Sequence, residues 1–193
     1  LVHTVCENGN CIGVPFRVAA DQVQLFLKKD PDFDVRSIMR KDFDQIFHAS
    51  VQQFSSIIRT DDPDLSQFRE AGGKLITWHG LADQLIFPNS TRQYYDRVLD
   101  VDANVREYFR YFEAPGVAHC FGGPGGPPVD AFERLIRWVE QLEAPEILNT
   151  ASPRNKDGIV SHQPLCTYPS LARFKGKVFR IAGCAAKNYL ARP

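Results

Sequence analysis

A histidine and an aspartate stand in two loops where they could act together as a base and its orienting acid. His119 lies in a run rich in glycine and proline, Ala114 to Gly123. Asp83 follows a short apolar segment that ends at His79. A neutral imidazole can take a proton from a hydroxyl nucleophile, and a carboxylate that accepts its other N–H fixes the tautomer and stabilises the imidazolium. The two residues therefore predict nucleophilic catalysis, with Asp83 as the acid member and His119 as the base.

Neither residue is informative when it is taken singly. An aspartate after a strand is commonly a turn or helix cap, and a lone histidine is commonly a core or surface residue. The order of Asp83 and His119, and their spacing by one strand–helix–strand unit, favour the catalytic interpretation. His79 competes with His119 for the role of base. Its place at a strand end, in a His-Gly pair before the acid loop, indicates a structural role instead.

Hydrophobic periodicity and breaker residues predict the elements that position these loops. We expect strands over 74–79 and 106–113, a helix over 89–99 between them, and a helix over 132–142 after the His119 loop. The residues expected to face inward from the two helices are Tyr94, Tyr95, Val98, Leu99, Phe132, Leu135, Ile136, Val139 and Leu142. Alternating strands and helices imply a parallel sheet, and functional residues gather at the carboxyl ends of its strands.

The first 63 residues follow a different, mostly helical pattern. We expect a helix over 21–29 that Pro31 ends and a strongly amphipathic helix over 43–54. A break at 60–64 follows, and a short helix over 65–71 then opens the next domain. The sequence therefore predicts a helical domain over 1–63 and an α/β domain over 64–193. From Ala144 onward we expect an extended C-terminal segment that is fixed to the rest of the second domain.

The order Asp83 then His119 is the order in which an α/β-hydrolase ends, and in that fold the serine comes first. The chain contains no Gly-x-Ser-x-Gly and no Cys-Ser dipeptide, and none of its serines falls on an expected strand–turn–helix elbow. We therefore expect the fold class α/β, with residues 64–193 forming the C-terminal part of an α/β-hydrolase sheet. The nucleophile would lie outside this chain.

Length and composition limit the class of protein. The 193 residues are 44% hydrophobic, which is enough for a packed core, and 23 basic residues balance 23 acidic residues. A formal net charge of zero argues against a nucleic acid or an anionic membrane as partner. No apolar run approaches the roughly 20 residues of a membrane span.

The five cysteines predict two local disulfides and one residue left over. Cys6 and Cys11 flank an Asn-Gly turn, and Cys166 and Cys184 bracket a segment near the end of the chain. Closing the second loop would stabilise the fold by roughly 3 kcal/mol. The remaining thiol, Cys120, is then expected to have an intermolecular partner or to be reactive. The alternative is a cytosolic protein with five thiols.

A glycosylation acceptor is consistent with secretion. Asn89-Ser90-Thr91 is an N-glycosylation acceptor, with Asn89 as the modified residue. The chain opens with Leu1 and shows no signal peptide, but a secreted protein could still produce it as a mature or internally cleaved product. Together with the cysteine pattern, the acceptor predicts an extracellular protein.

With its His119-Cys120 pair and its Asp83 loop, the sequence resembles the fungal tannase and feruloyl esterase family. In that family one cysteine precedes the catalytic serine, another follows the catalytic histidine, and the two form a disulfide. The resemblance runs from about Asp30 to the C-terminus. It includes residues 61–65, 71–74, 112–123 and 138–140. Members of the family are cleaved within a long lid insertion into two disulfide-linked chains.

The resemblance implies a secreted serine carboxylic-ester hydrolase that cleaves small aromatic esters, either feruloyl (hydroxycinnamoyl) or galloyl, with feruloyl slightly favoured. It implies that residues 1–63 are part of the lid. Cys120 would bridge to the N-terminal chain of the same precursor, which would carry the Cys-Ser nucleophile and most of the oxyanion hole. No cofactor or metal is expected in residues 1–193 themselves. The family's lid commonly holds a structural calcium, expected in the lid or the partner chain, while the acidic run 61–64 reads as a helix-capping cluster.

Two other classes of function remain open at this stage. A serine carboxypeptidase also uses serine, aspartate and histidine and can consist of two disulfide-linked chains, but it does not explain a cysteine directly after His119. A hydrolase-like binding module that has lost its serine is the non-enzymatic alternative. Such a module would need no partner chain, so masses measured with and without reduction would separate it from the enzyme.

Overall fold

The computed structural model describes residues 3–120, 122–172 and 184–185. The chain divides into two compact units, with the boundary between Asp62 and Pro63. This boundary lies beside the one expected from the change in sequence pattern. The assignment of the first unit to a lid stays a prediction.

The first unit begins with a β-hairpin that the sequence patterns did not predict. Strands β1 (His3–Glu7) and β2 (Asn10–Val14) pair antiparallel, and Asn8 and Gly9 between them both have positive φ, at 51° and 83°. Two such residues are what the tight hairpin turn requires. The turn sets Cys6 opposite Cys11, and the two form a disulfide.

Helices make up the rest of the first unit. Helix α1 (Arg17–Asp21) continues into a π-helical segment, Gln22–Lys28, which ends at Lys29 in the left-handed conformation. After a 3₁₀ turn, Val35–Ser37, the chain enters α2 (Arg40–Ile58). The expected helix over 21–29 is thus the second part of a longer helical run, and the expected amphipathic helix is extended at both ends.

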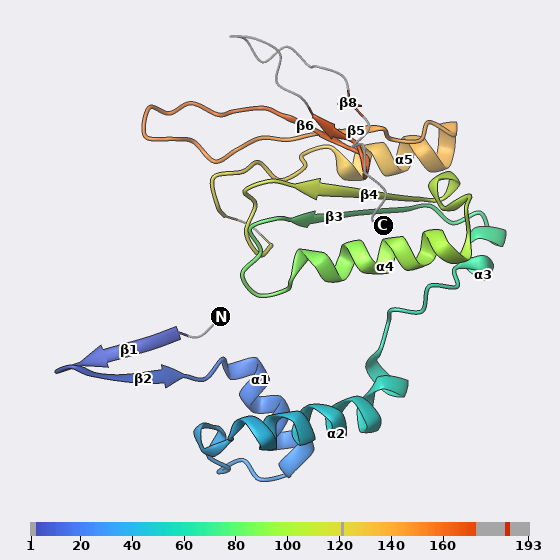
Figure 1. Ribbon diagram of the computed structural model, residues 1–193. Helices are drawn as coiled ribbons and strands as arrows, with labels where there is room; N and C mark the ends of the chain where they lie inside the picture. The colour runs from blue at the N-terminus through green and yellow to red at the C-terminus, as the bar shows by residue number, and fades with distance from the viewer. Residues whose placement is uncertain (1–2, 121, 173–183, 186–193) are drawn as a thin grey trace, which may run out of the picture. The chain divides into compact units, whose positions relative to one another are not determined.

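The second unit is built around the parallel pair β3 (Leu75–Gly80) and β4 (Phe109–Ala114), which follows the short helix α3 (Ser66–Glu70). Helix α4 (Pro88–Val101) connects the two strands, and α5 (Ala131–Gln141) follows β4. The expected strand over 106–113 starts later than predicted because Val105–Glu107 forms a 3₁₀ turn. The two helices lie on either side of the strand pair (Figure 1).

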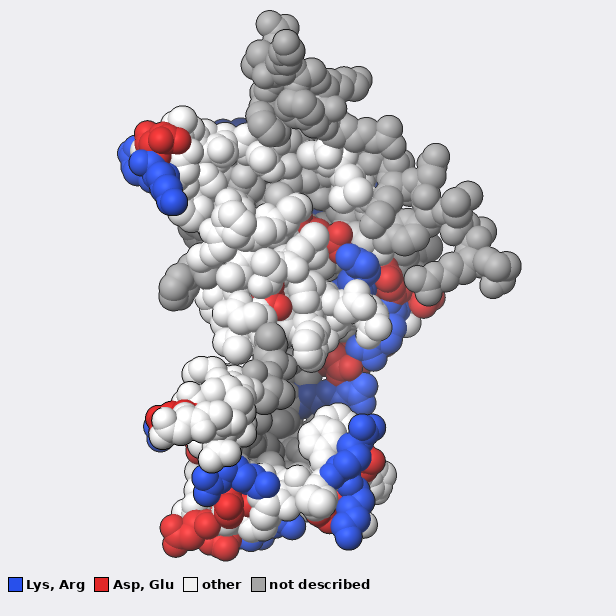
Figure 2. Space-filling view, turned by 60° about the vertical axis from the view of Figure 1, so that its left-hand side comes forward, with Lys and Arg blue, Asp and Glu red and all other residues white. Residues whose placement is uncertain are grey.

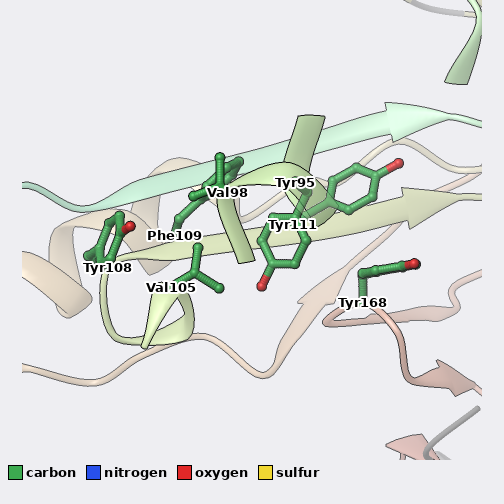
Figure 3. Close-up of a cluster of buried hydrophobic side chains, with 7 residues drawn as sticks. All are labelled: Tyr95, Val98, Val105, Tyr108, Phe109, Tyr111 and Tyr168. Carbon is green, nitrogen blue, oxygen red and sulfur yellow. The ribbon is translucent and has the colours of Figure 1, made fainter. Parts of the chain in front are cut away.

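Alternation along β4 divides the core into two clusters, one on each face. Phe109 and Tyr111 point toward α4, where they meet Tyr95 and Val98, all fully or almost fully buried. Figure 3 shows this cluster, which also includes Tyr168 from the C-terminal segment. The second cluster, on the side of α5, consists of Phe112, Ala114, Val117, Leu148 and Leu165. Buried aromatic rings on both faces hold β4 as the centre of this unit.

Helix α5 corrects one expectation about which side chains face the sheet. Trp138 is the residue of this helix that is buried, and the side chains of Lys74 and Arg110 lie over its ring. Phe132, Val139 and Leu142 were expected to pack on the sheet, but they are 76%, 57% and 79% exposed. The prediction was wrong for Phe132 and Val139 because the large indole of Trp138 takes the inward position, and for Leu142 because this residue is the left-handed C-cap of the helix. On α4, Tyr95 and Val98 are the buried residues, and Leu99, also expected to face inward, is 42% exposed.

The C-terminal segment adds short antiparallel pairs rather than a simple extended tail. Strand β5 (Ile147–Asn149) pairs with β6 (Pro164–Cys166), and β7 (Leu171–Ala172) pairs with β8 (Cys184–Ala185). The segment reaches β4 where the Tyr168 N–H donates to the Tyr111 carbonyl at 2.8 Å. A disulfide joins Cys166 to Cys184, as the sequence predicts. Backbone pairing therefore attaches this segment to the body of the unit, and the disulfide closes a loop within the segment itself.

The surface carries charges of both signs. On the face shown in Figure 2, basic and acidic side chains lie interspersed rather than gathered into a patch of one sign. Within the described ranges, each helix is too short or too polar to span a bilayer.

Candidate active site

The acid loop begins where β3 ends. Gly80 closes the strand, and the Asp83 N–H donates to its carbonyl at 3.1 Å in a tight turn. Two backbone groups further along the loop, the N–H groups of Leu85 and Ile86, each donate to Asp83 Oδ1 at 2.8 Å. The Asp83 carboxylate is thus held by hydrogen bonds from its own loop, and only 6% of the side chain is exposed.

The base loop begins where β4 ends and is tied to the acid loop by backbone hydrogen bonds. The Leu81 N–H donates to the Ala114 carbonyl at 2.9 Å, and the Ala82 N–H donates to the Val117 carbonyl at 3.0 Å. The Ala118 N–H donates to Gly122, which closes the loop around His119. Because parallel neighbours end at the same edge of a sheet, the two loops and their functional side chains meet there.

The structure brings Asp83 and His119 together. Nδ1 of His119 lies 3.0 Å from Oδ2 and 3.2 Å from Oδ1 of Asp83. Since an ionised carboxylate only accepts, Nδ1 carries the proton and donates, which leaves Nε2 as the basic nitrogen. The His119 side chain is 33% exposed, whereas its partner carboxylate is buried. This is the geometry of a general base that a buried acid orients.

Electrostatics keep the Asp83 carboxyl ionised. Burial alone would raise the pKa of Asp83, but the backbone N–H groups of Ile86 and Leu85, then the imidazoles of His119 and His79, outweigh it. The pKa therefore lies well below the usual value of about 3.9. A carboxylate that stays charged can stabilise an imidazolium on His119 throughout the neutral range.

His79 lies in contact with the same carboxylate. Its Nε2 is 3.1 Å from Asp83 Oδ2, and its Nδ1 is 2.7 Å from the Thr91 hydroxyl of α4. Its side chain is 12% exposed, so the ring is less accessible than that of His119. Both ring nitrogens of His79 are engaged with protein groups, which agrees with the structural role expected from its place beside the acid loop.

Cys120 follows His119 and is exposed. Its backbone φ of 59° is in the left-handed region, which is uncommon for a residue with a side chain. The other four cysteines pair as Cys6–Cys11 and Cys166–Cys184, so Cys120 is the free thiol among the described residues.

Two residues near the pair have roles that the sequence analysis missed. The Gln84 side-chain oxygen accepts from the His119 backbone N–H at 3.2 Å. Thr91 entered only as the third residue of the glycosylation acceptor, yet its hydroxyl reaches His79. Neither contact has a signal in the sequence, because each joins loops or elements that only the folded sheet brings together.

The remaining candidate residues lie apart from the pair. Asn89 is exposed in the first turn of α4. In the acidic run, Asp61 pairs with Arg59, and Asp64 Oδ1 accepts from the Ser66 N–H at the start of α3. Throughout the part of the chain that the structure describes, no three His, Cys, Asp or Glu side chains are grouped so as to hold a metal ion.

Comparisons of the sequence and of the structure with known proteins agree with each other. A family model described as "Tannase and feruloyl esterase" matches residues 13–186. A probable feruloyl esterase of Arthroderma benhamiae is 38% identical over 182 residues, which are 91% of this chain and 34% of that protein. The mono(2-hydroxyethyl) terephthalate hydrolase of Piscinibacter sakaiensis is 37% identical over 115 residues, 58% of this chain and 19% of that protein.

Solved structures share the fold. An esterase from Aspergillus oryzae superposes with a TM-score of 0.74 at 28% identity, over 92% of this chain and 38% of that chain. A tannin acyl hydrolase from Aspergillus niger superposes with a TM-score of 0.84 at 22% identity, over 95% and 36%. Both support an α/β-hydrolase-like fold. The chain spans about a third of the length of the curated feruloyl esterases that it matches.

Proposed function

We propose that this chain, which belongs to the tannase and feruloyl esterase family, supplies the acid and the base of a serine carboxylic-ester hydrolase. The observation that carries the proposal is the contact of His119 Nδ1 with the buried Asp83 carboxylate at 3.0 Å. His119 Nε2 would take the proton of a serine hydroxyl as that oxygen attacks the ester carbonyl. The resulting imidazolium would then give the proton to the leaving alcohol, and water would release the acid from the acyl-enzyme.

The serine is proposed to lie on another segment of the same precursor, disulfide-linked through Cys120. The absence of a Cys-Ser dipeptide from the sequence and the free, exposed Cys120 thiol support this. A bridge at Cys120 would hold the base at a set distance from the nucleophile, and such pre-organisation lowers the cost of reaching the reactive geometry. The oxyanion donors would come largely from the serine segment, since one is normally the N–H after the nucleophile.

The proposed substrate class is esters of aromatic acids, with feruloyl esters slightly favoured over galloyl esters. Three of the relatives named here point to aromatic acyl groups: a feruloyl esterase, a terephthalate monoester hydrolase and a tannin acyl hydrolase. The protein is further proposed to be secreted and glycosylated at Asn89, with residues 1–63 in a lid that the family resemblance links to structural calcium.

Turnover of methyl ferulate and methyl gallate by the full-length protein tests the proposal. We expect His119→Ala to lower kcat by several orders of magnitude, because the remaining rate would come only from binding and the oxyanion hole. His162→Ala is the matched control, since this histidine donates to the Thr150 carbonyl in the same unit, away from the pair. Equal turnover by His119→Ala and His162→Ala would refute the role of His119.

Peptide mapping without reduction tests the partner. We expect the Cys120 peptide to be linked to a peptide that contains Cys-Ser. A free Cys120 thiol in fully active protein would contradict the bridge, and cleavage of peptides but not of phenolic esters would favour a carboxypeptidase instead. If neither substrate class is turned over and no second chain is released by reduction, the binding-module alternative holds.

A further inference from the structure

The ring of His79 is held between two elements by both of its nitrogens. Nδ1 lies 2.7 Å from the hydroxyl of Thr91 on α4, while Nε2 lies 3.1 Å from Asp83 Oδ2 and 3.2 Å from the Ile86 carbonyl oxygen. Alternation along β3 puts His79 on the same face as Leu75, which packs against the α4 cluster. The contact with Thr91 is therefore a direct consequence of the register of this strand against the helix.

These neighbours determine where the His79 proton lies. Both groups facing Nε2 are acceptors, a carboxylate oxygen and a carbonyl oxygen, so Nε2 must carry the hydrogen. Nδ1 faces a hydroxyl, which can rotate to donate to it. The arrangement is a chain of donors that runs from the Thr91 hydroxyl to His79 Nδ1, and from His79 Nε2 to Asp83 Oδ2.

We propose that Thr91 and His79 are positioning residues that set the plane of the Asp83 carboxylate and, through it, the orientation of the base His119. This inference rests on the catalytic role proposed above for Asp83 and His119. Neither Thr91 nor His79 touches the reacting atoms: Thr91 fixes the ring of His79 through Nδ1, and His79 holds Asp83.

The division of labour between the two carboxylate oxygens supports this role. The N–H groups of Leu85 and Ile86 hold Oδ1, and they belong to the same loop as Asp83 itself. Among the described residues, the donors to Oδ2 are the side chains of His79 and His119, and His119 Nδ1 also lies 3.2 Å from Oδ1. Without the His79 N–H, Oδ2 would be positioned by His119, the residue whose orientation it is proposed to set. The His79 ring, which contacts Thr91 on α4, holds Oδ2 independently of His119.

Thr91 is also the third residue of the Asn89-Ser90-Thr91 acceptor, so a change at Thr91 can remove a glycan and a hydrogen bond together. The two effects separate if every variant is made in an Asn89→Gln background, where no glycan is attached at this site. In that background Thr91→Val removes the donor and keeps the shape, and Thr91→Ser keeps the donor. Ser90→Ala, an exposed neighbour in the same helical turn, is the matched control.

The first readout is steady-state hydrolysis of methyl ferulate by the full-length protein, with thermal stability measured on every variant. We expect Thr91→Val to lower kcat about 3- to 10-fold at unchanged KM, the size of effect that one lost hydrogen bond produces. Thr91→Ser should recover most of this loss. At His79, leucine should lower kcat more than glutamine, whose side-chain amide can still donate to Asp83 from nearly the same place.

The second readout does not depend on turnover. Nitrogen chemical shifts of ¹⁵N-histidine-labelled protein report which ring nitrogen carries the proton. We expect neutral His79 as the Nε2–H tautomer in the parent and in Thr91→Val, with the Nδ1 shift changed in the variant because Nδ1 has lost its hydrogen bond. If the parent hydrolyses no ester, the proposed function fails, and this measurement still decides whether the Thr91 hydroxyl donates to His79.

Three results would overturn the proposal. One is an unchanged kcat in Thr91→Val of parental stability. Another is an equal loss in Thr91→Val and Thr91→Ser, which would show that the hydroxyl is not responsible. The third is a His79 proton on Nδ1 in the parent protein.

Discussion

Gly80 lies where the acid loop and the base loop touch, so adding one methyl group there should separate Asp83 from His119, the two side chains proposed to be catalytic. A Cβ on residue 80 would stand 2.3 Å from the Val117 carbonyl oxygen, 2.8 Å from the Val117 carbonyl carbon and 3.1 Å from the Ala118 carbonyl oxygen. All three atoms are backbone, so no side chain can swing aside to make room. The same Val117 carbonyl accepts the hydrogen bond from the Ala82 N–H that joins the loops.

The size of the displacement follows from these distances. Ordinary contact requires about 3.5 Å, so Gly80→Ala must move the loops apart by about 1 Å. The hydrogen bond between His119 and Asp83, now 3.0 Å, would lengthen beyond useful range. A misplacement of about 1 Å in a catalytic site can cost roughly 100-fold in rate. We therefore expect Gly80→Ala to lower kcat/KM about 100-fold, with a loss of about 1–3 kcal/mol in unfolding free energy from overpacking.

Hydrolysis of methyl ferulate and urea unfolding of the full-length protein measure the two effects. Gly73→Ala is the matched control, because its Cβ would stand 2.4 Å from the Phe68 ring at the opposite end of β3. We expect this control to lose stability and keep its activity. Turnover by Gly80→Ala within about threefold of the parent would refute the claim that contact between these loops sets the Asp83–His119 distance.

Other predictions concern the carboxylate and the core. Asp83→Asn should lower kcat by roughly 10⁴-fold in steady-state assays, since the amide favours the wrong imidazole tautomer, and a smaller loss than His79→Ala would contradict its role. Because the pKa of Asp83 is lowered, its contribution to stability is present above the unfolded pKa of about 3.9 and is lost as pH falls further. The parent-minus-Asp83→Asn difference in unfolding free energy should therefore shrink as pH falls below about 4; a difference that stays unchanged from about pH 4 down to about pH 2 would contradict the lowered pKa. Phe112→Ala, at a fully buried ring, should cost about 3–5 kcal/mol in urea unfolding, and a loss below about 1 kcal/mol would contradict its place in the core.

The parallel strand pair was predictable because the sequences of buried parallel strands are short, nearly continuous apolar runs. Residues 74–79 have this pattern, and β3 is displaced from them by one residue. Once two such strands are recognised, the rule that loops gather at their carboxyl ends brings Asp83 and His119 to one edge. The candidate pair therefore follows from order and spacing along the chain.

Other parts depend on contacts that no local pattern encodes. The strands of the N-terminal hairpin are exposed on both faces, so they lack the apolar alternation that marks a half-buried strand. The pairing of β5 with β6 joins residues on either side of a long connecting loop, 150–163. On α5, periodicity showed an apolar stripe but could not show that Trp138 would take the inward position. The hydrogen bonds of Thr91 and Gln84 are tertiary contacts in the same sense.

The four N–H donors around Asp83 have a consequence for how many protons move. Leu85 and Ile86 fill Oδ1, and His119 and His79 fill Oδ2, so the four lone-pair sites of the carboxylate are all taken. A proton that arrived on this group would have to displace one of those donors. In the proposed mechanism the travelling proton therefore stops on His119, and Asp83 acts as a fixed charge rather than a relay. The rate of ester hydrolysis, measured in mixtures of H₂O and D₂O, should accordingly decrease linearly with the deuterium fraction. A linear decrease is expected when a single proton is transferred in the rate-limiting step.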